Sequence, residues 1–272
     1  MVIGSENWTL TVFRDAQTAS EAAADVVSGT VLSKPDASIT FPTGSTPLPM
    51  FDVLAARAAR GEVEFSGVAV FCLDEYVGVT VEDPNSLTRW LWDALLNRIG
   101  VKLDRVTMLP VTADDLVEAA AEFEEAIATR GGLDLAILGL GPNGHIGYNE
   151  PGSNADSRTR VIALTPESRE QASAYWEGAL PIPDEAMTMG VGTLLEAKQI
   201  VLLVTGETKA DMLRRTLEES VSADVPASWL RIAGPRLTVI ADEAAASELS
   251  AVQLARPALR EHRGGDIGDG SL

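Results

Sequence analysis

Two stretches of the sequence place ionisable side chains where they could exchange protons with a ligand. Asp74 and Glu75 directly follow the apolar run VAVFCL (residues 68–73), and one of them could serve as a general base if partial burial tuned its pKa. His145 and Glu150 lie five residues apart in the turn-rich segment GLGPNGHIGYNEPGS (residues 139–153), so both could face one cleft. A carboxylate near a histidine favours the protonated ring and orients it. The alternative in each case is structural, because adjacent acids can simply begin a turn and a lone histidine more often stabilises a fold.

Two further stretches have the composition of anion-binding loops. PTGSTP (residues 42–47) combines a glycine, which lets the backbone approach a ligand, with hydroxyl donors and the start of a predicted helix. No GK[ST] follows, so it is not a Walker loop. Lys209 in GETKA (residues 206–210) lies in the first turn of another predicted helix, where the helix dipole disfavours a cation. A lysine at that position could bind an anionic ligand. The alternatives are a plain N-cap turn and a solvent-exposed lysine.

These stretches must be positioned by the elements that precede them. Short apolar runs predict strands at residues 8–13, 38–41, 68–73, 106–109, 133–138, 160–164, 200–204 and 237–241. Helical periodicity predicts helices at residues 18–32, 49–59, 87–99, 114–129, 166–176, 207–220 and 243–254. This alternation predicts an α/β fold in which parallel strands lie beneath helices on both faces. Ligands in such folds bind beyond the carboxyl ends of the strands, where all four stretches would meet.

Composition excludes several classes of function. The 272 residues include 21 Lys and Arg against 40 Asp and Glu, and the resulting charge of −19 disfavours binding to nucleic acid and to anionic membranes. One cysteine, Cys72, cannot form an internal disulfide, and two distant histidines argue against a zinc site. No apolar run approaches the ~20 residues of a membrane span, and the N-terminus lacks the features of a signal peptide. We therefore expect a cytoplasmic protein with one domain over residues 1–262 and a flexible tail over residues 263–272.

Taken together, the stretches resemble the glucosamine-6-phosphate deaminase (isomerase) family, within the larger group that includes 6-phosphogluconolactonases. The matching segments occur in the family order and are PTGSTP (42–47), LDEYVG (73–78), GLGPNGHIGYNEPGS (139–153), SRTR (157–160), MGVGTLL (189–195) and GETKA (206–210). The continuation NEPGS after GHI is typical of the deaminase branch. The resemblance implies a Rossmann-like three-layer α/β/α sandwich with a mostly parallel sheet. It also implies a cytosolic enzyme that converts a hexosamine phosphate and water to fructose 6-phosphate and ammonia, with no organic cofactor or metal.

The resemblance also implies roles for individual residues. His145, held by Glu150, would open the sugar ring, and Asp74 would move a proton from C2 to C1. Glu75 would support its loop rather than do chemistry. Asn143 lies in the catalytic loop, and the substrate- and phosphate-binding set comprises Thr43, Gly44, Ser45, Thr46, Lys209, Glu75 and Gly144.

The sequence departs from the family pattern at several positions. Asn143 stands where many members have Asp, and Asn cannot take a proton. Ala174 stands where an arginine usually contacts the substrate phosphate, which leaves Arg169 as a candidate substitute. Arg160 matches one basic position of the allosteric site of some bacterial members, but Ile162 replaces a usual lysine. We therefore predict no activation by N-acetylglucosamine 6-phosphate.

Alternatives to a glucosamine-6-phosphate deaminase follow from these departures. The substrate could be another hexosamine phosphate, such as galactosamine 6-phosphate, or a less phosphorylated sugar. A 6-phosphogluconolactonase-type hydrolase would need the histidine but not Asp74, and a non-catalytic sugar-phosphate sensor would need neither for turnover. Family members occur as monomers and hexamers, so a homo-oligomer stays open.

Overall fold

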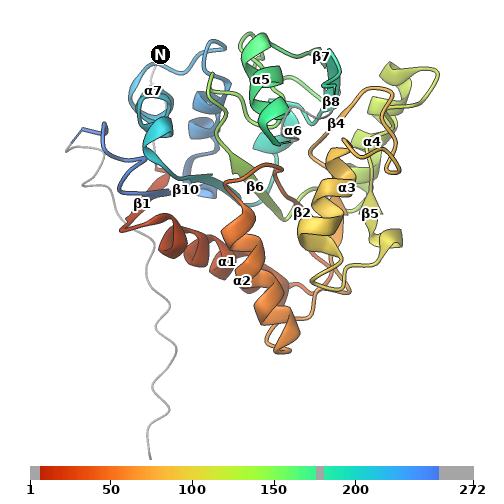
Figure 1. Ribbon diagram of the computed structural model, residues 1–272, viewed down its shortest axis with the longest axis horizontal. Coiled ribbons are helices and arrows are strands. Elements are labelled where there is room, and N and C mark those ends of the chain that lie inside the picture. Colours follow the sequence, from red (N-terminus) through yellow and green to blue (C-terminus); the bar gives the residue numbers. More distant parts are fainter. Residues whose placement is uncertain (1–6, 176–180, 251–272) are drawn as a thin grey trace, which may run out of the picture.

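The computed structural model describes residues 7–175 and 181–250 and has a seven-stranded sheet at its centre (Figure 1). Every pairing in this sheet is parallel, and the strand order is β1-β10-β9-β6-β2-β3-β5. The strands are β1 (Thr9–Phe13), β2 (Ser38–Thr40), β3 (Ala69–Phe71), β5 (Val106–Thr107), β6 (Leu135–Gly139), β9 (Ile200–Val204) and β10 (Leu237–Asp242). The predicted mostly parallel sheet is therefore confirmed.

Helices cover both faces of this sheet, because successive strand residues point to opposite sides. Leu135 and Ile137 of β6 pack into one apolar cluster, and Ala136 and Leu138 pack into the other. The first cluster includes residues of α1 (Ala16–Ser33), α2 (Leu48–Ala59), α3 (Leu87–Leu91) and the π-helical turn η1 (Trp92–Leu96). The second includes residues of α4 (Leu116–Thr129), α6 (Val191–Leu195), α7 (Ala210–Glu218) and the 3-10 segment η4 (Pro226–Arg236). The three-layer α/β/α sandwich is thus confirmed, with α1 and α2 side by side on one face (Figure 1).

Local sequence signals explain where several helices begin. Asp15 caps α1 by accepting a hydrogen bond from the backbone N–H of Thr18, and Asp115 caps α4 through the N–H groups of Val117 and Glu118. The predicted helix over residues 87–99 instead changes from α3 into η1 and ends at Leu96. A short 3-10 turn, η2 (Leu103–Arg105), then leads into β5. None of the helices in the described ranges is long and apolar enough to cross a membrane.

A second, three-stranded antiparallel sheet was not predicted. It comprises β4 (Asp74–Tyr76), β8 (Glu185–Thr188) and β7 (Arg160–Ala163), in the order β4-β8-β7. Asp74 pairs with Thr188 in this sheet, so it lies in a strand rather than in the expected loop. The strands β4 and β8 have only three and four residues, too few for a period-two pattern to stand out from a turn. Helix α5 (Pro166–Tyr175) follows β7 and lies beside this sheet (Figure 1).

Near the C-terminal end, one predicted helix is present with a different first turn and another is wrong over its described part. The helix predicted over residues 207–220 begins with a 3-10 turn, η3 (Glu207–Lys209), before α7. The helix predicted over residues 243–254 is wrong over its described part. Residues 243–248 form turns, in which the Asp242 carboxylate accepts a hydrogen bond from the N–H of Ala245. Residues 251–254, the predicted tail 263–272 and His262 lie outside the described residues.

Candidate active site

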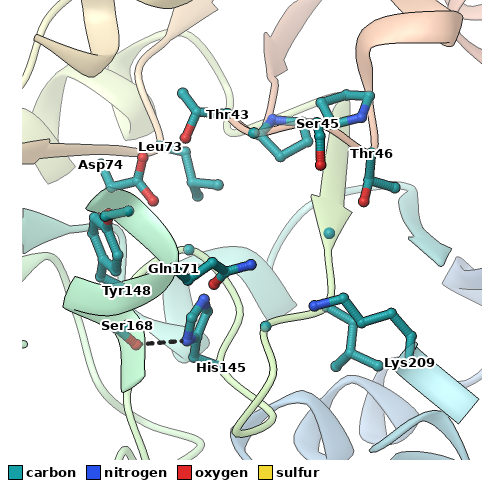
Figure 2. Close-up of a pocket in the computed structure, with 18 residues that line it drawn as sticks. Thr43, Ser45, Thr46, Leu73, Asp74, His145, Tyr148, Ser168, Gln171 and Lys209 are labelled. Atoms are coloured by element: carbon teal, nitrogen blue, oxygen red, sulfur yellow. Dashed lines mark hydrogen bonds between the residues drawn. The ribbon is translucent and has the colours of Figure 1, made fainter. Parts of the chain in front are cut away.

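The four stretches singled out in the sequence meet in one pocket beyond the carboxyl ends of β2, β3, β6 and β9. Figure 2 shows side chains from these loops pointing toward a common centre. From the predicted set, the pocket brings together Thr43, Gly44, Ser45, Thr46, Asp74, His145 and Lys209. Four other predicted residues do not line it, namely Glu75, Asn143, Gly144 and Glu150.

One end of the pocket carries donors suited to a phosphate. Ser45 and Thr46 point into the pocket opposite the amine of Lys209 (Figure 2), from a loop that leads directly into α2. Gly44 has a φ of 106°, a conformation that an L-residue rarely adopts, so the tight turn before α2 requires glycine. Partial burial lowers the pKa of Lys209, which has no ion-pair partner within the described residues. This end therefore offers an unpaired cation, hydroxyl donors and a helix start to an anion.

Asp74 lies at the other end of the pocket with its carboxylate largely withheld from solvent. Its side chain is buried, and its Oδ1 atom has no hydrogen-bond partner. Burial, with a smaller contribution from the charge of Glu75, raises the pKa of Asp74 to about 7. A carboxylate with this pKa is poised to accept and return a proton near neutral pH.

Glu75 points away from the pocket, because neighbouring residues of a strand face opposite sides. Its carboxylate holds the start of α3, accepting hydrogen bonds from the N–H of Tyr76 (3.0 Å), the hydroxyl of Ser86 (2.7 Å), and the N–H groups of Leu87 (3.0 Å) and Thr88 (2.9 Å). Glu75 was predicted among the binding residues, but it does not line the pocket. The expected supporting role agrees with these contacts.

His145 is buried at the pocket wall, close against the backbone of Gly141. A Cβ atom at position 141 would lie only 2.3 Å from the ring, so the glycine makes room for the imidazole. Burial lowers the pKa of His145 to about 4; Glu150 opposes this shift, and Lys209 adds to it. Glu150 favours the protonated ring, as expected, but desolvation outweighs this attraction, so the net shift of the pKa is downward. The ring is neutral at neutral pH.

Asn143 lies between His145 and Glu150, which do not touch directly. The Nδ1 atom of His145 is 3.8 Å from Glu150 Oε2, beyond hydrogen-bond distance. Asn143 instead donates from Nδ2 to Glu150 Oε2 (2.8 Å), while its Oδ1 lies 2.8 Å from His145 Nδ1 and accepts from the backbone N–H of His145 (3.2 Å).

This arrangement selects one tautomer of the histidine. A carboxylate accepts but cannot donate, so the NH₂ group of Asn143 must face Glu150 and its oxygen must face the ring. The ring nitrogen Nδ1 therefore carries the proton, and Nε2 presents a free lone pair toward the centre of the pocket (Figure 2). Asn143 cannot take a proton, but it can orient the imidazole as a base.

Gly144 has a packing role. Its φ is 86°, and a Cβ atom there would lie 2.9 Å from Val225 Cγ1 and 3.0 Å from Met212 Sδ. The segment from Gly141 to His145 must therefore turn tightly beneath α7. Gly144 sets the path of the loop and does not line the pocket.

Helix α5 supplies pocket residues that the sequence did not single out. Ser168, Gln171 and Ala172 share one face of this helix and line the pocket. Gln171 extends its carboxamide between His145 and Lys209 (Figure 2), and it makes no hydrogen bond within residues 7–175 and 181–250. The i, i+3, i+4 spacing was visible in the sequence. Its direction was not, because the sheet that positions α5 was missed.

The predicted substitute for the missing arginine, Arg169, is not at this pocket. Arg169 points away from it and forms an ion pair with Asp184 (2.5 Å). The side chain of Ala174 lies outside the described part of α5. Lys209 is therefore the cation at this pocket among the residues described.

Arg160 is held internally at the position where the resemblance suggested an allosteric contact. Its guanidinium donates to Asn149 Oδ1 (2.9 Å) and to the hydroxyl of Ser153 (2.7 Å), and burial lowers its pKa. Ile162 packs against the apolar cluster of the small sheet. The absence of allosteric activation stays a prediction.

Comparison with known proteins places these features in a family. The glucosamine-6-phosphate deaminase of Streptomyces avermitilis is 41% identical over 236 residues, which are 86% of this chain and 90% of that protein. The deaminase of Thermoanaerobacter pseudethanolicus is 38% identical over 228 residues, 84% of this chain and 90% of that protein. The solved structure of a monomeric glucosamine-6-phosphate deaminase has a TM-score of 0.83 at 34% identity, covering 88% of this chain and 99% of that chain.

A more distant structure shares the fold. The 6-phosphogluconolactonase of Trypanosoma brucei has a TM-score of 0.71 at 20% identity, covering 90% of this chain and 100% of that chain. Residues 14–239 match the family model described as glucosamine-6-phosphate isomerases/6-phosphogluconolactonase. This chain therefore belongs to the glucosamine-6-phosphate isomerase/6-phosphogluconolactonase family.

Proposed function

We propose that this protein is an amino-sugar-phosphate deaminase that converts glucosamine 6-phosphate, or a closely related hexosamine 6-phosphate, and water to a ketose 6-phosphate and ammonia. One observation carries the proposal. The buried Asp74 carboxylate, with its unpartnered Oδ1, faces the same pocket as the unprotonated Nε2 of His145. An isomerising deaminase needs both groups, because it must open a sugar ring and then move a proton between adjacent carbons.

The first task falls to His145. Its Nε2 lone pair takes the proton of the anomeric hydroxyl and returns it to the ring oxygen, which breaks the C1–O5 bond and leaves an aldehyde at C1. A ring that is neutral at working pH suits this step, because it can accept a proton before it donates one. Asn143 and Glu150 keep Nε2 directed at the pocket throughout.

The second task falls to Asp74. Its ionised carboxylate removes the proton from C2 and delivers it to C1, while the amine loses a proton and the C1 oxygen gains one, so that C2 carries an imine and C1 a hydroxyl. Water then adds to C2, and ammonia leaves as the carbon becomes a ketone. Burial keeps Asp74 basic enough to accept a carbon-bound proton and acidic enough to return it.

The phosphate would lie at the opposite end of the pocket, against Lys209 and the loop that contains Ser45 and Thr46. Binding this remote group holds the sugar in register with Asp74 and His145. Because Arg169 is turned away, this anion relies on one cation and on neutral donors. We expect the enzyme to work in the cytoplasm, where hexosamine phosphates would be supplied by sugar phosphorylation.

The proposal is tested by measuring ammonia release from glucosamine 6-phosphate and galactosamine 6-phosphate, with 6-phosphogluconolactone hydrolysis measured in parallel. Ammonia release that is abolished in Asp74→Asn supports the deaminase. Lactone hydrolysis that survives in Asp74→Asn, without ammonia release from any hexosamine phosphate, would identify a lactonase instead. Calorimetric binding with no turnover of either substrate would identify a sugar-phosphate sensor.

A further inference from the structure

Two hydroxyl groups also connect His145 to Glu150, and Asn143 contacts them by donating from Nδ2 to the hydroxyl oxygen of Thr165 (3.1 Å). The hydroxyl of Ser168 lies 3.0 Å from His145 Nδ1, as the dashed line in Figure 2 shows. The hydroxyl of Thr165 lies 3.2 Å from that of Ser168 and 3.2 Å from Glu150 Oε2. Ser168 is 1% exposed, so solvent does not compete for these contacts.

Glu150 and the ring N–H of His145 fix which atoms donate at the two ends of this chain. Glu150 can only accept, so the Thr165 hydroxyl donates to it. The oxygen of Thr165 accepts from Asn143 Nδ2 (3.1 Å) and from the backbone N–H of Ser168 (3.3 Å), and it lies 3.2 Å from the hydroxyl of Ser168, whose oxygen faces Nδ1. Asn143 already requires Nδ1 to carry the proton, so the ring N–H meets two acceptors, Asn143 Oδ1 and Ser168 Oγ.

We propose that Ser168 is a positioning residue for the catalytic histidine, within a network that also contains Thr165 and Asn143 and ends on the charge of Glu150. This inference rests on the proposed function, because it assumes that Nε2 of His145 takes a proton from the sugar. When it does, the ring becomes a buried cation. An aligned chain of hydroxyls that ends on a carboxylate stabilises that cation more than the neutral ring.

The same contact connects the histidine to the wall of the pocket. Ser168 belongs to the face of α5 that also presents Gln171 and Ala172 to the ligand. The helix that contacts the sugar therefore also sets the orientation of the base. Ser168 acts through its contact with the ring, which is why its role is positioning.

The kinetic test uses Ser168→Ala, Thr165→Val, the double variant, Ser168→Thr, and Ser173→Ala as the matched control on the same helix. Ser173 lies outside this pocket. We expect each of Ser168→Ala and Thr165→Val to lower kcat for ammonia release about tenfold, with KM changed less than about twofold. The double variant should be no worse than the poorer single variant, because either substitution already breaks the chain.

Ser168→Thr retains the hydroxyl and should restore most of kcat, and Ser173→Ala should match the unsubstituted enzyme. Losses that multiply to about a hundredfold in the double variant would overturn the proposal, since independent effects add in free energy. An unchanged kcat in Ser168→Ala would also overturn it.

A second measurement needs no substrate. The sequence has two histidines, so His262→Gln with isotope-labelled histidine leaves the ring of His145 as the one histidine signal. We expect nitrogen NMR to show a proton on Nδ1, and Ser168→Ala to shift that proton's resonance. Thr165→Val should shift it as well, because Thr165 contacts both Ser168 and Asn143, the two acceptors of the ring N–H. A proton resonance that stays in place in Ser168→Ala would overturn the proposal.

The two measurements separate the two claims. If the unsubstituted enzyme released no ammonia from any hexosamine phosphate, the proposed function would fail. The NMR result would still decide whether Ser168 and Thr165 hold the ring.

Discussion

At the phosphate end of the pocket, Ser45 and Thr46 make no side-chain hydrogen bond within the described ranges. At the reacting end, by contrast, the ring of His145 is held on one edge by Asn143 and Ser168 before any sugar arrives. Asp74 lies beside it, buried and unneutralised. The first end keeps its donors free for an anion that brings its own charge. The second fixes the orientation of one base and raises the basicity of the other, which is the arrangement expected where a barrier must be lowered.

The largest expected effect comes from removing the base at the reacting end. Asp74→Asn should lower kcat by about a thousandfold or more while KM changes little, because an amide cannot move the C2 proton. Steady-state ammonia release measures this, with the exposed Asp93→Asn as the matched control. A loss confined to KM would mean that Asp74 only binds the sugar.

A substitution at the phosphate end should have the opposite kinetic signature. Lys209→Met should lower kcat/KM by about a hundredfold, mainly through KM, because it removes a charge-assisted contact to the phosphate. The exposed Lys102→Met is the control. If Lys209→Met changed only kcat, Lys209 would act in the chemical step, and the two ends of the pocket would not be functionally separate.

The pH dependence should report the reacting end alone. Since burial raises the pKa of Asp74 to about 7, kcat/KM should fall about tenfold per pH unit below that value as the base becomes protonated. Glu75→Gln removes a nearby charge that contributes to this shift, so the acid limb should move to lower pH. Lys209→Met should leave it in place, because the lysine does not contribute to the raised pKa of Asp74.

The free energy of unfolding should depend on pH because Asp74 is buried. The raised pKa means that Asp74 favours folding while it is protonated, and this contribution is lost as the pH rises from about 4 to about 7. His145 has the opposite sign, because its lowered pKa destabilises the fold as the pH falls from about 6.5 toward 4. Asp74→Asn should therefore gain stability relative to the unsubstituted protein as the pH rises over this range. Urea unfolding at about pH 5 and about pH 8 measures the gain; a constant difference would contradict it.

The smallest effect should come from a single hydroxyl at the phosphate end. Ser45→Ala should lower kcat/KM about threefold, because neighbouring donors and water can replace one neutral hydrogen bond. Ser66→Ala is a matched control, since the half-buried Ser66 does not line this pocket. A loss as large as that of Lys209→Met would show that this loop, not the lysine, carries the phosphate.

Much of the scaffold could be predicted because it repeats a simple pattern. Apolar runs such as LDLAIL predicted buried parallel strands, and the loops after them were placed at one edge of the sheet. The failures share a physical cause. The strands β4 and β8 are short and acquire their identity by pairing with each other across more than a hundred residues. Without them, α5 could not be placed, and Ser168 and Gln171 were missed.

Residue types and their spacing alone identified the groups that could react. The sequence contains two acids after one strand, a histidine in a glycine-rich loop after another, and a lysine where a helix disfavours one. The tertiary structure decided what these groups can do. Asp74 and Glu75 are neighbours in the chain, yet one faces the pocket without a partner and the other caps a helix. The pKa of His145 moved opposite to the expectation from its nearby acid. Desolvation and hydrogen bonding depend on every atom that surrounds a group, and only the folded packing supplies those atoms.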